Sequence, residues 1–318
     1  MTDLSDTSVF RLHIRPRGGL AEPQVSFAYC LREQVLGMGW AVHFPDQRLL
    51  TWEEYEALAT DVHGGGDLSR VRFLRSNVRK DDLIWTRDTR GRYFLARVTS
   101  PWEYFETQDS LDADIVNVVR CRILEVTAVD DIPGKVVACF RPSRTIQRIA
   151  DSVAVTYTRF LWNKLSGQDD YPLPLLVGLS LFSLLDAETV EDVIFIYLQL
   201  QGWLVVPHSR KVDTMGFEFV LINRETKERA TVQVKTGNTP LDRSDWKNLG
   251  TVFLFQASGI YNGEEIPKVV CLLPESILRF VMDNLPLMPA VVQRWSAFVR
   301  EQSTQQRVAG DAPNAAGA

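Results

Sequence analysis

Four polar side chains in the second half of the chain have the types and spacing that metal-assisted hydrolysis requires. Gln233 and Lys235 stand two residues apart among valines, and alternate residues of a β-strand share a face, so both point the same way. Glu218 lies in the preceding apolar run, and Glu191 lies at the edge of the apolar face of an upstream helical pattern. We expect these four residues to be catalytic.

This set of residues suits a divalent cation. Mg²⁺ takes oxygen ligands and retains several waters, so a carboxylate with an amide oxygen and a main-chain oxygen is sufficient. We expect Glu218 to be the main ligand, with Gln233 supplying its side-chain oxygen and Val234 its carbonyl. Bound Mg²⁺, or Mn²⁺ in its place, would activate water and stabilise charge on a scissile phosphate. Lys235 would orient the attacking water or neutralise the developing oxyanion.

One helix and several strands must position these residues. Asp186 is a suitable N-cap for a helix over residues 187–201, which Gly202 ends. The periodicity predicts an αβββαββα order. Strands are expected over residues 203–206, 217–222, 230–236, 252–255 and 269–273, and further helices over residues 241–249 and 275–284.

A hairpin between two of these strands would bring the acid, the amide and the amine together. If its turn is centred between residues 226 and 227, Val220 pairs with Gln233 and Glu218 pairs with Lys235. The register is an assumption. The alternative is a surface hairpin whose polar side chains are merely solvated.

The order of these features resembles the PD-(D/E)xK restriction-endonuclease-like superfamily, nearest its Mrr-type nucleases. The likeness covers about residues 186–285 and implies Mg²⁺-dependent phosphodiester hydrolysis. Glu218 stands where many relatives have Asp, which leaves Asp213 as a rival metal ligand. An inactivated member of the superfamily is the alternative. The matching positions are Glu191, the Leu-Gln-Gly-Trp run at 200–203, Glu218 and the Gln-Val-Lys tripeptide at 233–235.

The first half of the chain reads as short strands separated by turns. Residues 83–87 and 93–98 are rich in β-forming side chains and flank a turn that contains Gly91, which is typical of a hairpin. A further strand is expected over residues 136–140, and a helix near residues 52–59. A small β-barrel or sandwich would accommodate these elements.

Basic and aromatic residues alternate along part of this half. Nine Arg or Lys stand against three Asp between residues 70 and 97. Such a local excess can contact phosphates whatever the charge of the whole chain. Proteins that extract a base from DNA hold it between aromatic side chains, so this composition indicates a base-reading pocket. The expected phosphate contacts are Arg75, Arg79, Lys80, Arg87, Arg90 and Arg92.

This half resembles PUA-like domains of the EVE kind over about residues 35–141. The likeness rests on the segments 39–40, 82–87, 91–98 and 102–104. It implies a small barrel that holds a modified base in an aromatic cage. The alternatives are that the aromatic side chains fill the barrel core and that the basic residues form an ordinary solvated face. The cage candidates are Trp40, Trp85, Trp102 and Tyr104.

Length and composition limit the number of domains and the class of protein. At about 150 residues per domain, 318 residues suggest two domains, and 45% apolar with 24% charged residues is typical of globular proteins. A net charge of -5 argues against coating of nucleic acid through bulk charge. Four scattered cysteines argue against a zinc cluster or a disulfide framework. We expect no secretory signal and no membrane span, which favours a cytoplasmic protein.

The expected fold class is α+β combined with α/β. Residues 1–142 would form the PUA-like base-reading barrel, and residues 143–185 a helical linker whose helix begins at Arg144. Residues 186–300 would form the restriction-endonuclease-like αβββαβ domain, followed by a disordered tail over residues 301–318.

Taken together, these features predict a modification-dependent DNA endonuclease of the restriction or antiviral-defence type. Its expected partner is double-stranded DNA with modified bases. A homodimer is expected if both strands are cut, because one such site cuts one strand. The alternatives are a nuclease gated by a small nucleotide or a partner protein, and a catalytically inactive nucleic-acid-binding protein.

Overall fold

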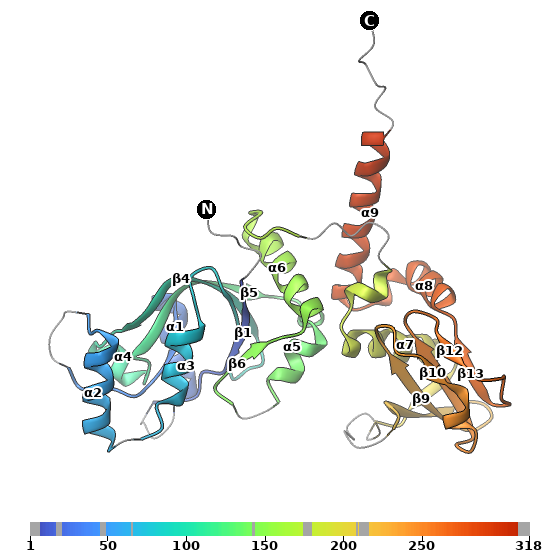
Figure 1. Ribbon diagram of the computed structural model, residues 1–318, viewed down its shortest axis with the longest axis horizontal. Helices are drawn as coiled ribbons and strands as arrows, with labels where there is room; N and C mark the ends of the chain where they lie inside the picture. The colour runs from blue at the N-terminus through green and yellow to red at the C-terminus, as the bar shows by residue number, and fades with distance from the viewer. Residues whose placement is uncertain are drawn as a thin grey trace, which may run out of the picture. The chain divides into compact units, whose positions relative to one another are not determined.

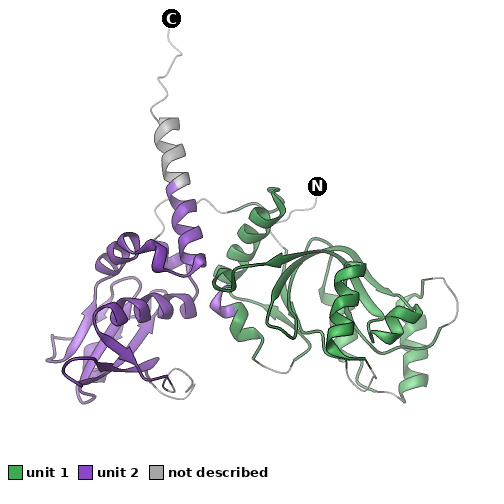
Figure 2. Cartoon of the chain, turned by 180° about the vertical axis from the view of Figure 1, so that it is seen from behind, with its two compact units in different colours: residues 1–132, 136–173 green, residues 133–135, 174–318 purple. Residues whose placement is uncertain are grey.

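The chain is a mixed α+β protein that divides into two compact units, as its computed structural model shows (Figures 1 and 2). The first unit comprises residues 1–132 and 136–173, and the second comprises residues 133–135 and 174–318. Each is built around one mixed β-sheet. The structure describes residues 7–16, 21–44, 49–64, 66–141, 144–173, 180–207, 209 and 216–310, with side chains up to residue 300.

The first sheet has the strand order β2-β5-β4-β3-β1-β6. Its neighbours are antiparallel except for β1 and β3, which run parallel. Within the described residues β2 and β6 are sheet edges, so this sheet is open and is not the closed barrel that the EVE resemblance implies. Its strands are β1 (Val9–Leu12), β2 (Val35–Met38), β3 (Leu83–Arg87), β4 (Tyr93–Tyr104), β5 (Asn117–Val126) and β6 (Ile146–Ile149).

Helices pack on both faces of the first sheet. One face presents Phe10, Ile84 and Phe94 to a core that is shared with the first three helices. The other face presents Trp85, which reaches the last helix of the unit through a hydrogen bond to Thr158. The helices are α1 (Pro23–Glu33), α2 (Trp52–His63), α3 (Ser69–Asn77), α4 (Gln108–Asp112), α5 (Gly134–Cys139) and α6 (Ser152–Ser166).

Local patterns in the first unit are confirmed where the turn chemistry is strong. β3 and β4 form the expected hairpin, and the turn is fixed by the Asp88 carboxylate, which accepts hydrogen bonds from the backbone N–H of Arg90 and of Arg92. The strand predicted over residues 136–140 is wrong, because α5 occupies this segment. The helix predicted from Arg144 is also wrong: β6 comes first, and α6 begins only after its N-cap, Asp151.

The second sheet has the strand order β13-β11-β9-β8-β7. β7, β8 and β9 form an antiparallel meander, whereas β11 runs parallel to both β9 and β13. The elements are α7 (Ala187–Leu200), β7 (Trp203–Val205), β8 (Phe219–Asn223), β9 (Arg229–Lys235), β10 (Leu241–Asp242), β11 (Thr251–Gln256), β12 (Tyr261–Asn262), β13 (Val269–Leu272), α8 (Pro274–Asp283) and α9 (Ala290–Gly310).

The helix α7 forms where its sequence predicts. The Asp186 carboxylate accepts a hydrogen bond from Thr189 N at 2.8 Å, which caps one of the free N–H groups of the first turn. Apolar residues at helical spacing are buried along one side, which packs on the sheet at β7 and β9. Gly202, with a left-handed φ of 86°, then turns the chain into β7.

Two expectations for the second unit need correction. The helix predicted over residues 241–249 is instead β10 followed by a short 3-10 helix, Arg243–Trp246. The tail predicted as disordered from residue 301 continues α9 as far as Gly310, and residues 311–318 lie outside the described residues. Throughout the described part of the chain, each helix is too short or too polar to cross a lipid bilayer.

Candidate functional site

The side chain of Gln233 brings two oxygens together in the second unit. Gln233 is only 4% exposed on β9. Its Nε2 donates a hydrogen bond to Glu218 Oε1 at 2.7 Å and another to the carbonyl oxygen of Val234 at 3.1 Å. A carboxylate oxygen and a main-chain oxygen therefore converge on one electropositive group.

The register of the β8–β9 hairpin explains this contact. Phe219 pairs with Val232, and Glu218 N donates to Val232 O at 2.8 Å. The assumed register, with Glu218 opposite Lys235, is wrong by two residues. Side chains alternate with a period of two, so this shift leaves every residue on its expected face. It does place Glu218 beside Gln233 and not beside Lys235.

Lys235 ends β9 on the same face as Gln233, with its side chain exposed. It pairs in register with Gln256, the last residue of β11, and its carbonyl accepts a hydrogen bond from Ala257 N at 2.9 Å. Both interactions fix the backbone from which the lysine projects. Lys235 is therefore held two residues beyond the amide on the same face of β9, with its side chain exposed.

Gln256 is a positioning residue that the sequence analysis missed. Its side chain is fully buried, and its Nε2 donates to the carbonyls of Gly237 at 2.8 Å and Thr239 at 3.1 Å. Its Oε1 accepts from Ser258 N at 2.7 Å and Ile260 N at 3.0 Å. These hydrogen bonds stabilise the loop that follows Lys235. The sequence feature that could have indicated this role is a glutamine at the end of a mostly apolar run, Thr-Val-Phe-Leu-Phe-Gln.

Glu191 lies on α7, at the end of the sheet where Glu218 and Gln233 also lie. It is half-buried one turn before Phe195, whose ring lies 6.0 Å from that of Phe219 at the start of β8. The other end of α7 leads into Trp203, which pairs with Asn223 at the far end of β8. Because α7 covers the opposite face from Gln233, Glu191 can join the cluster only around the end of the sheet.

The donor set fits a hard cation such as Mg²⁺. The Glu218 and Val234 oxygens already point at one positively polarised N–H₂ group, and Gln233 can contribute its own Oε1. Among the residues that the structure describes there is no cluster of three or more His, Cys, Asp or Glu, so a metal would rely on one carboxylate and neutral oxygens. Asp213, the rival ligand, lies outside the described residues.

Comparisons with family models, curated proteins and solved structures found no match to this chain. The geometry of the site itself therefore indicates its chemistry. Two features of that geometry matter most. The oxygens of Glu218 and Val234 converge, and Lys235 lies next on the same face of the sheet.

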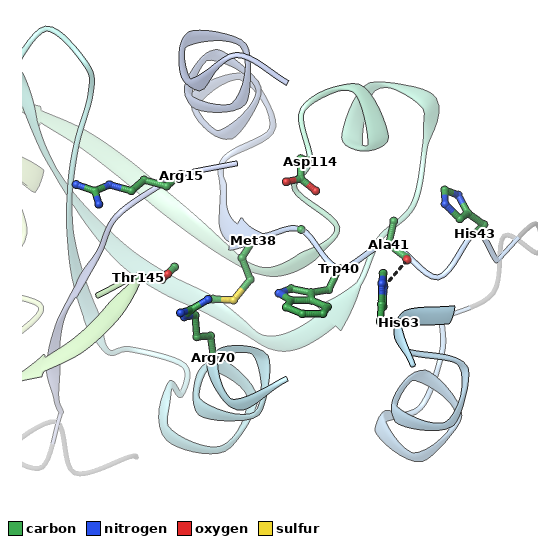
Figure 3. A pocket seen from close by; sticks show the side chains of 10 residues that line it. Arg15, Met38, Trp40, Ala41, His43, His63, Arg70, Asp114 and Thr145 are labelled. Atoms are coloured by element: carbon green, nitrogen blue, oxygen red, sulfur yellow. Dashed lines mark hydrogen bonds between the residues drawn. The ribbon is translucent and has the colours of Figure 1, made fainter. Parts of the chain in front are cut away.

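A cavity of about 430 Å³ in the first unit contains one of the four cage candidates (Figure 3). Trp40 lines it and meets the edge of His63 with ring centroids 5.0 Å apart. His63 is held by a hydrogen bond between its Nε2 and Ala41 O at 2.9 Å. Arg70 and Asp114 also line the cavity and bring opposite charges to it. An aromatic surface is thus combined with groups that can form hydrogen bonds.

The backbone around this cavity is strained. Trp40, His43 and Asp114 have left-handed φ angles of 72°, 52° and 50°. Such angles are unusual for residues other than glycine, and they gather at ligand sites more often than elsewhere. Gly39 touches the Asp114 carboxylate so closely that any Cβ at this position would collide with it. The fold therefore forces Trp40 and Asp114 to flank the same cavity.

The other three cage candidates do not line this cavity. Trp85 is completely buried and donates to Thr158 Oγ1 at 3.0 Å on the opposite face of the sheet, so its assignment to a cage is wrong. Trp102 and Tyr104 pack on Tyr55 with ring centroids 5.5 and 5.2 Å away. The Tyr55 hydroxyl donates to the Trp40 carbonyl at 3.1 Å, so this aromatic cluster supports the cavity from behind.

The six expected phosphate contacts fall into two groups. Arg75, Arg79 and Lys80 are exposed at the end of α3 and just beyond it. The other three belong to the β3–β4 hairpin. There Arg87 packs over Phe140 at 5.2 Å, and Arg92 forms an ion pair with Asp88 at 2.8 Å, whereas Arg90 is exposed.

Proposed function

We propose that this chain is a modification-dependent DNA endonuclease whose second unit hydrolyses phosphodiester bonds with Mg²⁺. The observation that supports the proposal best is the convergence of Glu218 Oε1 and Val234 O on the buried Gln233 amide, next to Lys235. A purely structural hairpin has no need of a half-buried acid, a buried amide and a lysine on one face.

The order of elements in the second unit also supports a nuclease. α7 is followed by the antiparallel meander of β7, β8 and β9, and then by β11 parallel to β9. This order agrees with the αβββ part and the last strand of the αβββαβ arrangement that the PD-(D/E)xK resemblance implies, whereas β10 and the short 3-10 helix Arg243–Trp246 stand in place of its second helix. Glu218 immediately precedes the second strand of the meander, and the Gln-x-Lys tripeptide ends the third.

Each residue then has a distinct role. Glu218, Gln233 and Val234 would hold Mg²⁺, which when bound supplies Lewis-acid stabilisation of charge on the phosphate. Lys235 would donate hydrogen bonds to the attacking water or to a phosphate oxygen, because its ammonium group is exposed on the same face. Glu191 would act from the end of the sheet as an additional hydrogen-bond acceptor.

The cavity around Trp40 would select the substrate. Its size of about 430 Å³ lies within the range of small-molecule sites, and an extruded base could pack against the indole ring. Arg70 and Asp114 offer a donor and an acceptor to the edge of such a base. A cavity of this size would also accommodate a free nucleotide, which supports a nucleotide-gated nuclease as the second candidate.

A cleavage assay on matched substrates tests the proposal. Duplexes of one sequence, with unmodified or modified cytosine or adenine, are incubated with the purified chain and Mg²⁺. The proposal predicts cutting of at least one modified duplex and much slower cutting of the unmodified one. Equal cutting of all duplexes would contradict the reading role. Cutting of an unmodified duplex only after addition of a free nucleotide would favour the nucleotide-gated alternative.

A further inference from the structure

A second cavity of about 480 Å³ in the first unit is lined by an excess of positive charge. Arg15, Arg87 and Arg90 line it together with His13. Their proximity follows from the topology, because β1 and β3 run parallel with Arg11 opposite Trp85, so the residues after both strands emerge at one edge. We call this cavity the arginine recess.

His13 lines the recess and has a buried ring nitrogen without a hydrogen-bond partner. Its side chain is only 9% exposed, and its Nδ1 is buried without a partner. Its ring meets the edge of Phe140 at 5.6 Å. Burial, with the charges of Arg15, Arg11 and Arg87, lowers the pKa of His13 to about 4. A buried polar atom without a partner is costly, and a bound group would remove that cost.

The charges around the recess are only partly balanced. Arg11 is fully buried, and its guanidinium donates to neutral groups, namely the carbonyls of Arg144 and Thr145 and the side chain of Gln147. Asp88 also lines the recess, but its carboxylate accepts hydrogen bonds from the hairpin turn and from the Arg92 guanidinium. The recess therefore has room for an anion.

We propose that the arginine recess binds a phosphate group. Arg15, Arg87 and Arg90 would supply charge-assisted hydrogen bonds, which guanidinium groups form well with phosphate oxygens, and His13 would supply a further one. Arg15 lines both this recess and the Trp40 cavity, so the two are neighbours. The recess would hold the phosphate that flanks a base seated against Trp40, an inference that deepens the proposed reading function.

The test measures binding without Mg²⁺, so that it does not depend on cleavage. The full chain is titrated with inorganic pyrophosphate by calorimetry, and with a 20-base-pair duplex by fluorescence anisotropy at several salt concentrations. The test variant is the double substitution Arg15→Gln with Arg90→Gln, because both side chains are exposed. The control is Arg72→Gln, which removes an exposed α3 arginine that pairs with Glu56.

The double variant should bind pyrophosphate at least about 10-fold more weakly, and the slope of its DNA affinity against salt should fall by roughly two. The affinity of the control for both probes should stay within about twofold of that of the parent chain, since Arg72 pairs with Glu56 on α2 and does not line the recess. If pyrophosphate binding falls but DNA binding does not, the phosphate belongs to a free nucleotide and not to DNA.

Equal affinities of the double variant and the control for both probes would overturn the proposal, as would a parent chain that binds neither probe. A further readout is the NMR titration of the His13 imidazole. Its midpoint should rise from about 4 when pyrophosphate is present, because a nearby anion favours the protonated ring. Failure to distinguish modified from unmodified DNA would refute the proposed reading function and would leave phosphate binding in place.

Discussion

Glu218 and Gln233 are joined by a hydrogen bond of 2.7 Å from Gln233 Nε2 to Glu218 Oε1. The same Nε2 also donates to the Val234 carbonyl, so one buried amide group satisfies both oxygens when no cation is bound. This relationship explains how an acid and a carbonyl can lie close together without mutual repulsion. It also keeps the two oxygens aimed at a single point.

Replacing the amide by an acid should make the second unit depend on Mg²⁺ for stability. Gln233→Glu places a second carboxylate against Glu218, and the loss of the hydrogen bond together with like-charge repulsion should cost about 1–3 kcal/mol. Added Mg²⁺ should recover much of this loss by binding the folded state. Thermal unfolding with and without Mg²⁺ measures both effects.

The matched control for that experiment is Gln199→Glu, which makes the same change at an exposed position of α7. Its midpoint should move little under either condition, since surface substitutions usually change stability by less than about 0.5 kcal/mol. If Gln233→Glu loses the same amount of thermal stability with and without Mg²⁺, the result would argue against a metal site at Gln233.

Removing the carboxylate should weaken metal binding directly. Glu218→Gln retains the size of the side chain but removes the charge that a Mg²⁺ ion requires. We expect calorimetry to show at least about a 10-fold loss of Mg²⁺ affinity, a change of roughly 1.4 kcal/mol. The control is Glu225→Gln in the exposed β8–β9 turn. Unchanged Mg²⁺ affinity in Glu218→Gln would indicate that another acid is the main ligand, and Asp213 would be the first candidate.

Trp40 and Trp85 should differ sharply in their effect on substrate binding. Trp40 lines the cavity, so Trp40→Ala should weaken binding of a modified duplex by about 5- to 100-fold, as expected when base stacking worth about 1–3 kcal/mol is lost. Trp85→Phe should lower the melting temperature through the lost bond to Thr158 but leave affinity intact. The reverse pattern in anisotropy titrations would refute the cavity assignment.

Acid should destabilise the first unit through His13. The pKa of this residue in the fold is about 4, lowered by burial and by Arg15, Arg11 and Arg87, whereas an unfolded histidine titrates near 6.5. As the pH falls from 6.5 to 4, only the unfolded state gains the proton, so stability should decline by up to about 3 kcal/mol.

Denaturant titrations across that pH range test this claim. The variant His13→Gln, which cannot titrate, should show a flatter profile between pH 6.5 and 4, whatever its absolute stability. The exposed His43 serves as the comparison site. If His13→Gln and His43→Gln follow the same slope as the parent chain, the histidine is not the titrating group.

Local chemistry made part of this fold predictable. The cap at Asp186, the stop at Gly202 and the hairpin turn at Asp88 each depend on neighbouring residues, and each lies where the sequence indicated. The shared face of Gln233 and Lys235 follows from strand periodicity alone. Patterns of this kind need no knowledge of the rest of the chain.

Contacts with other parts of the fold determine the elements that the sequence pattern did not predict. Residues 146–149 are a strand because they pair with β1, far away in the chain. The run after Gly134 has strand-forming residues but folds as α5, where Val136 and Cys139 become buried, and short apolar runs of this kind are ambiguous by pattern. The hairpin register depended on the Asn223 side chain, which accepts hydrogen bonds from two N–H groups of the turn.

The most direct test of the nuclease assignment is DNA cleavage by a lysine variant. The parent chain, Lys235→Ala and Lys227→Ala are compared on modified and unmodified duplexes with Mg²⁺ and with EDTA; Lys227 lies in the exposed β8–β9 turn. We predict Mg²⁺-dependent cutting by the parent chain and by Lys227→Ala, and a loss of roughly 100-fold or more in Lys235→Ala. Full-rate cutting by Lys235→Ala, or no cutting of any duplex by the parent chain, would contradict the assignment.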